Sequence, residues 1–198
     1  MKHLKILALA AVAATALMAF AGAGSAVATT LTNPVNTKLA TGTKIAAENE
    51  GAITLTTVFL HIACQESQIQ GKTTNESGPS ISGNVEILTF GNCNCEVVVL
   101  KKGTFLITSE GNGNGLFTSN EAELTTKCST VFGVVHCIYR TATTHLGTLT
   151  GSDNTKATAT LDIVESEVPV VATDALCNAE AKLDAKYKVT NPDSLFID

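Results

Sequence analysis

Six cysteines, all of them after residue 63, are the feature that most constrains what this chain can fold into. An even number of cysteines in an exported chain is typical of a disulfide framework, which holds distant segments against one another. The count allows many different pairings, so it does not by itself give the connectivity. The cysteines are Cys64, Cys93, Cys95, Cys128, Cys137 and Cys177.

One disulfide is predicted from a hairpin pattern in TTKCSTVFGVVHCIYR, residues 125–140. The pattern indicates two strands joined by a two-residue loop, Phe132-Gly133. Val131 would then face Val134, and Cys128 would lie opposite Cys137 in a non-hydrogen-bonded pair. The Cα atoms of such a pair are about 4.5 Å apart, which is within disulfide range. We therefore expect Cys128 and Cys137 to be paired.

The closely spaced Cys93 and Cys95 are not expected to bond to each other, because the ring would be very small and strained. We expect Cys64 and Cys177 to be their partners, and the sequence leaves open which bonds to which. A metal site is the rival interpretation, but structural zinc prefers two Cys-x₂₋₄-Cys knuckles and the CNC motif supplies neither. Exposure to an oxidising compartment also favours disulfides over a metal site or a redox pair. No metal site is therefore predicted.

The first 28 residues have the pattern of a cleavable secretory signal peptide. Lys2 and Lys5 form a short basic region, an apolar stretch follows, and Ala26-Val27-Ala28 supplies a small-x-small cleavage site. The apolar stretch approaches the length of a membrane anchor, but it is rich in Ala and Gly rather than Leu. Cleavage after Ala28 is the favoured interpretation, and cleavage after Ala26 also fits. The predicted location is secreted or extracytoplasmic.

The remaining segment, residues 29–198, is long enough for one domain with its own core. Residues 29–50 are rich in Thr, Asn and Ala, and we expect them to be a loosely ordered lead-in. The whole chain has a net charge of −5, and removal of the two signal lysines makes it more acidic. Without a basic patch, nucleic acids are poor candidates as partners. No second apolar segment is long enough to span a membrane, so stable membrane insertion is not expected after cleavage.

From residue 51 onward, short runs of β-branched residues alternate with turns rich in Gly, Asn and Asp, which predicts an all-β fold. Hairpin signals such as GNGNG at 111–115 and GSDNTK at 151–156 favour antiparallel pairing. We expect an antiparallel β-sandwich, of jelly-roll or immunoglobulin-like type, although the pattern does not separate a sandwich from a barrel. One short helix is expected near the C-terminus, over residues 175–187.

Several sequence blocks resemble a group of uncharacterised secreted actinobacterial proteins that contain cysteines and have β structure. The blocks are ATTL, LTFGNC, VVHCIY, HLGTLTG, ALCNAEAKLDAKYKVT and the final NPDSLFID. The resemblance implies export and a shared cysteine framework. It brings no activity, cofactor or site residue with it.

No sequence motif predicts catalysis or cofactor binding. Of the three histidines after the signal, His61, His136 and His145, none lies in a metalloprotease motif, and no nucleophile elbow is present. GNGNG is flanked by strand-like segments, which favours a turn over a phosphate loop. Glu110, Asn112 and Asn114 alternate oxygen ligands, but neutral asparagines are weak calcium ligands.

The resulting functional hypothesis is a non-enzymatic, disulfide-stabilised structural or interaction module of the cell envelope or extracellular space. Its partner is not predicted. The alternative is a carrier of a small apolar ligand on a β-barrel or sandwich, and a hydrolase is the third hypothesis. No catalytic, cofactor-binding or metal-binding residue is predicted.

Overall fold

The computed structural model describes residues 28–34, 36–152, 158–174, 176–177 and 180–198 of the chain. Over these residues the secondary structure is all β, and the strand ladders are antiparallel. The predicted all-β, antiparallel fold is therefore confirmed. Residues 1–27, which hold all but the last residue of the expected signal peptide, lie outside the described residues.

In chain order, the strands are β1 (Thr29–Thr32), β2 (Lys44–Asn49), β3 (Ile53–Thr56), β4 (His61–Thr73), β5 (Ser77–Gly78), β6 (Ile81–Cys93), β7 (Glu96–Lys101), β8 (Thr104–Gly111), β9 (Asn114–Asn120), β10 (Glu123–Thr130), β11 (Gly133–Arg140), β12 (Thr144–Thr150), β13 (Thr160–Thr173), β14 (Glu180–Asn191) and β15 (Phe196–Ile197).

Eight strands close into a barrel in the order β4, β6, β8, β9, β12, β13, β14 and β2, with β2 returning to β4. The closure is made by β2, where Ala47 pairs with Val189 of β14 on one side and with Ile69 of β4 on the other. A sandwich would consist of two packed sheets, whereas this ladder returns to its first strand. The predicted sandwich is therefore wrong, because alternating strands fit both architectures and only the closing pairs distinguish them.

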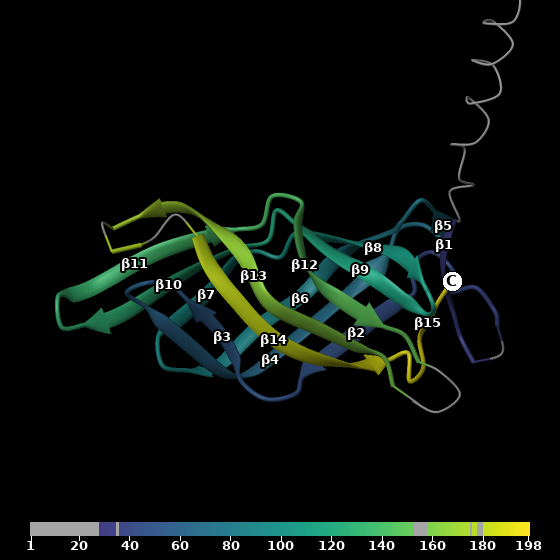
Figure 1. The fold of residues 1–198 in the computed structure, drawn as a ribbon, viewed down its shortest axis with the longest axis horizontal. Coiled ribbons are helices and arrows are strands. Elements are labelled where there is room, and N and C mark those ends of the chain that lie inside the picture. The colour runs from purple at the N-terminus through teal and green to yellow at the C-terminus, as the bar shows by residue number, and fades with distance from the viewer. Residues whose placement is uncertain (1–27, 35, 153–157, 175, 178–179) are drawn as a thin grey trace, which may run out of the picture.

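The molecule is long because four strands extend beyond the barrel (Figure 1). Past the end of β2, β3 takes the place between β4 and β14, with Leu55 opposite both Ile62 and Leu183. The far part of β13 pairs with β11, which is followed by β10 and β7. We call β3, β7, β10, β11 and the adjoining ends of β4, β6, β13 and β14 the cavity section, and the remainder of the closed ring the barrel section.

The opposite end of the barrel section is covered by a small sheet of β15, β1 and β5 (Figure 1). Leu31 of β1 and Ile197 of β15 are opposite one another and almost fully buried. Residues 29–50 thus contribute β1 and β2 instead of a loosely ordered lead-in. The Thr-rich composition suggested a polar, exposed segment, whereas Thr29, Thr30 and Thr32 are buried in β1.

The expected helix over residues 175–187 is not formed. Residues 180–187 belong to β14, while residues 175, 178 and 179 lie outside the described residues. Ala181, Ala185 and Tyr187 face the interior, and the lysines between them face solvent. This period of two satisfies a sheet, and tertiary burial overrides the helix preference of Ala and Lys.

Candidate functional site

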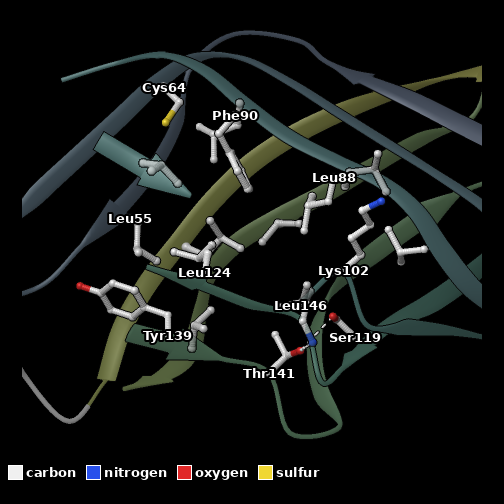
Figure 2. A pocket seen from close by; sticks show the side chains of 18 of the residues that line it. Leu55, Cys64, Leu88, Phe90, Lys102, Ser119, Leu124, Tyr139, Thr141 and Leu146 are labelled. Carbon is white, nitrogen blue, oxygen red and sulfur yellow. Dashed lines mark hydrogen bonds between the residues drawn. The ribbon is translucent and has the colours of Figure 1, made fainter. Parts of the chain in front are cut away.

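An apolar cavity of about 110 Å³ lies inside the molecule, where the cavity section meets the barrel section. Side chains of both sections form its wall, and Figure 2 shows these side chains converging on the cavity. The wall is dominated by aliphatic and aromatic groups. Examples are Leu55, Ile62, Leu88, Phe90 and Leu124. Such a wall favours an apolar occupant over water.

A stacked aromatic pair separates this cavity from the core of the barrel section. Phe105 and Phe117 have ring centroids 6.0 Å apart and an interplanar angle of 14°. A smaller space of about 40 Å³ lies among the barrel residues, and both rings also border it. Phe105 fits there because Gly71 and Gly83 present bare backbone: a Cβ on Gly83 would lie 2.1 Å from its ring. The glycines therefore fix where the cavity ends.

Beside the cavity, β6 and β7 face each other without a strand ladder between them. Beyond Asn84, β6 pairs only with β4, and β7 pairs only with β10, so no ladder joins the two facing edges among the described strands. The exposed Lys102 lies in this part of the cavity wall, and its ammonium donates a hydrogen bond to the Glu86 carbonyl. Half-buried Phe90 is on the β6 side. We call this stretch the mouth.

The three disulfides are Cys64–Cys93, Cys95–Cys128 and Cys137–Cys177, and no described cysteine is free. Three disulfides within one chain indicate an oxidising, extracytoplasmic environment. Cys64 lies opposite Cys93 in the β4–β6 ladder, with their Cα atoms 3.9 Å apart. The prediction that Cys64 takes one cysteine of the CNC motif is therefore correct.

The predicted Cys128–Cys137 disulfide is wrong, because the turn of its hairpin lies one residue earlier than expected. Thr130 pairs with Gly133, which makes Val131-Phe132 the loop and places Cys128 opposite Val135. Cys128 and Cys137 still share a face, but they are diagonal neighbours. Diagonal residues are about 7–8 Å apart, beyond the reach of a disulfide.

Cys128 and Cys137 instead bond to cysteines beside β7 and β13, the two strands that flank the hairpin. Cys128 bonds to Cys95, the residue just before β7, with Cα atoms 4.7 Å apart. Cys137 bonds to Cys177 in the connection after β13, with Cα atoms 5.8 Å apart. The expectation that Cys177 bonds to Cys93 or Cys95 is therefore also wrong.

The disulfides make up for the missing β6–β7 ladder. Cys93 ends β6, and Cys95, after the single residue Asn94, immediately precedes β7. The bonds Cys64–Cys93 and Cys95–Cys128 therefore tie β4, β6, β7 and β10 into one covalent band beneath the mouth. The wall can thus be open between two strands without their ends separating.

Polar side chains in the cavity wall differ in their hydrogen bonding. The Tyr187 hydroxyl is 2.9 Å from Ser67 Oγ, and burial raises the Tyr187 pKa to about 12, with the Ser67 contact opposing the rise. By contrast, the hydroxyls of Tyr139 and Thr126 have no hydrogen-bond partner, and each residue is only 1% exposed. Burial also raises the Tyr139 pKa, opposed by the nearby Thr126 hydroxyl, although the two do not meet in good hydrogen-bond geometry.

Tyr139 and Thr126 were not singled out by sequence analysis as site residues. A usable signal was present, because Tyr139 follows Cys137 by two positions and so shares its inward face. Nothing in the sequence shows that the space in front of that face is unfilled.

The histidines and the candidate calcium ligands are not brought into one site. His61, His136 and His145 are all exposed, and the described residues contain no group of three His, Cys, Asp or Glu side chains arranged to hold a metal ion. The GNGNG segment forms the β8–β9 hairpin turn, as predicted, with Gly111 opposite Asn114. Glu110 and Asn112 are exposed there.

Two turns of the cavity section expose apolar side chains. Both contain the sequence Thr-Val-Phe, at 57–59 and at 130–132. In each, the threonine Oγ1 accepts a hydrogen bond from the backbone amide of the phenylalanine, at 3.3 and 3.1 Å. The valine and phenylalanine side chains project into solvent in both turns. We call these the Val-Phe tips.

The chain matches no protein-family model, no curated protein and no solved structure. Over the described residues, no helix has the length and apolar character required to cross a membrane. The functional argument therefore depends on the cavity and the surface themselves.

Proposed function

We propose that this protein is an exported, non-enzymatic binding protein that carries a small apolar molecule in its cavity. The observation that carries the proposal is the apolar cavity with a mouth between β6 and β7. An apolar cavity of roughly 150 Å³ in another protein stays dry and binds benzene. A cavity of about 110 Å³ therefore suits one small ring or a short alkyl chain.

Two further features support this function. The side chains of the cavity wall include hydroxyl groups but neither a histidine nor a carboxylate, the groups most used for proton transfer in catalysis. The three disulfides fit a protein that works outside the cytoplasm, as the N-terminal signal pattern also predicts.

The test uses the absence of tryptophan from the chain, which allows a single fluorescent reporter. Phe90→Trp places the reporter at the mouth, and Phe132→Trp places it on an exposed Val-Phe tip as the matched control. Titration with toluene is expected to shift the Phe90→Trp emission with saturation and to leave the Phe132→Trp emission unchanged. Equal or absent responses would contradict a carrier that binds in the cavity.

A filled cavity provides a second readout. Leu124→Trp adds bulk to the centre of the cavity wall, whereas Leu100→Trp adds the same bulk on the exposed face of β7. Toluene is expected to stabilise the Leu100→Trp protein against heat and not the Leu124→Trp protein. Native mass spectrometry of the wild-type protein isolated from its own host is expected to show a bound small molecule.

The Val-Phe tips favour a second candidate function, an interaction module that binds an apolar partner surface. Exposed aromatic side chains grouped on one section of a protein are common in interfaces. The double variant Phe59→Ser/Phe132→Ser would lose a partner that the wild-type protein retains from envelope extracts. Val98→Ser/Leu100→Ser, which alters exposed residues of β7, is the control. The same set of partners for all three proteins would contradict this function.

A further inference from the structure

One cation is built into the otherwise uncharged wall of the cavity. Among the described residues that form the wall, Lys102 is the charged one, and no Asp, Glu, Arg or His contributes. Lys102 is also exposed to solvent, so it lies where the cavity wall meets the surface. Figure 2 shows it at the same end of the cavity as Leu88, away from Tyr139. The cavity therefore combines an apolar interior with one positive charge at its edge.

The backbone fixes the position of this cation. Lys102 lies in the connection between β7 and β8, just before Gly103. Gly103 has a φ of +72°, and a Cβ there would lie 2.4 Å from the Asn120 carbonyl oxygen and 2.5 Å from the Ala122 nitrogen. The Gly103 carbonyl also accepts a hydrogen bond from the Val85 amide, at 3.1 Å. This close packing holds the start of the Lys102 side chain at one end of the mouth.

The Lys102 ammonium has hydrogen-bonding capacity left. An ammonium group has three N–H donors. Within the described part of the chain, the hydrogen-bond partner of Lys102 is the Glu86 backbone carbonyl, on the β6 side of the mouth. Two donors therefore remain for water or for a ligand that reaches the mouth.

The neighbouring carboxylates do not neutralise this charge. The Glu86 side chain is paired with Lys72, with 2.8 Å between Oε1 and Nζ, and the Glu123 carboxylate is paired with Arg140. No described carboxylate lies within ion-pair distance of Lys102. An anionic group at the mouth would therefore meet a cation that has no counter-ion of its own.

We propose that the cavity takes a short amphiphilic anion, a carboxylate on a small apolar tail, with the tail in the cavity and the carboxylate on the Lys102 ammonium. This inference rests on the proposed carrier function and names its ligand class. The tail fills the apolar space, for which a short alkyl chain has the right size. The carboxylate stays beside an exposed cation and in contact with water, so no unpaired charge is buried.

The test compares hexanoate with 1-hexanol, which have the same chain length, by isothermal titration calorimetry at physiological ionic strength. Lys102→Met removes the charge and keeps an unbranched side chain. The dissociation constant for hexanoate is expected to rise about three- to tenfold, an effect between that of an exposed ion pair and that of a charged hydrogen bond. The constant for 1-hexanol is expected to stay within about twofold, because this probe carries no charge.

Two further variants are the controls for the lysine. Lys101→Met removes the adjacent charge, which is not part of the cavity wall and lies 3.8 Å from Glu123. It should change neither constant, since charges beyond the ligand are screened by salt. Lys102→Arg keeps the positive charge and should bind hexanoate as the wild type does.

Leu124→Trp, which fills the cavity, should weaken the binding of both probes, because both place their tails there. Hexanoate binding that is unchanged in Leu124→Trp, or that falls equally in Lys101→Met and Lys102→Met, would overturn the inference, since the anion would then bind to the basic surface alone. If both probes bind and Lys102→Met changes neither constant, or if 1-hexanol alone binds, the ligand class is wrong and the carrier function stands. If hexanoate, 1-hexanol and toluene all fail to bind, the carrier function itself fails.

Discussion

The two tyrosines of the cavity wall should respond in opposite ways to the loss of a hydroxyl group. Tyr187→Phe removes a buried hydrogen bond of 2.9 Å and leaves the Ser67 hydroxyl without its partner. Leaving such a buried group unsatisfied costs about 1–3 kcal/mol. Tyr139→Phe removes a hydroxyl that has no partner in the folded protein. Its free energy of unfolding should be unchanged or higher by up to about 1 kcal/mol.

The measurement is denaturation by guanidinium chloride and by heat, followed by far-ultraviolet circular dichroism, with the disulfides intact and no ligand added. For a chain of this size, each kcal/mol corresponds to about 2–4 °C in Tm, so Tyr187→Phe should melt about 2–12 °C below the wild type. Tyr139→Phe should melt at or above the wild-type temperature. The two substitutions are chemically identical, which makes each the control for the other.

The reasoning is refuted if Tyr139→Phe destabilises the protein as much as Tyr187→Phe does. That result would mean that the Tyr139 hydroxyl has a hydrogen-bond partner in the ligand-free protein. The apolar cavity itself would be unaffected by that result.

Three further predictions follow from the burial and the cross-links. Burial raises the pKa of both tyrosines, that of Tyr187 to about 12, so folding favours their neutral forms. The contribution of the two neutral tyrosines to the free energy of unfolding is complete below pH 10 and is lost as the pH rises towards 12. Phenolate absorbance should therefore appear at a higher pH in the folded than in the unfolded chain. Identical titration curves for the two states would contradict this prediction. Gly83→Ala should lower the free energy of unfolding by about 1–3 kcal/mol or more, because its Cβ would overlap the Phe105 ring, and a neutral effect in denaturation would show that the ring can move. Reduction of the disulfides should remove hydrogen-exchange protection from β7, β10 and β11 while β8, β9 and β12 remain protected, and uniform loss of protection would contradict separate stabilisation of the two sections.

The sequence predicts strand content and antiparallel pairing well, because both depend on local alternation and turn residues. The β8–β9 hairpin at GNGNG is an example. It predicts the length of strands poorly where the inward residues are small or polar. Residues 65–82 are polar and rich in turn residues, which predicts a loop, yet residues 65–73 belong to β4, whose inward positions include Ser67 and Thr73. Barrel closure through β2 depends on contacts between distant segments that no local pattern records.

Of the features around the candidate site, the sequence predicted the shared face of Cys128 and Cys137, and both side chains are buried. The pairing failed because a shift of one residue in the turn changes each cross-strand partner by two positions. The cavity could not be predicted at all, because a wall of leucine, valine and phenylalanine has the same sequence whether the space in front of it is filled or empty.

The covalent band formed by the disulfides has a consequence for when the proposed binding cavity is complete. All six cysteines lie in or beside the cavity section, and the ladders of the barrel section need none of them. While thiols are reduced, the barrel section has its full set of strand pairs, but the binding section lacks the links that hold its open wall together. If the cavity binds a ligand as proposed, completion of that site depends on an oxidising environment. Under the proposed carrier function, a newly made chain would take up its first ligand only after its disulfides have formed.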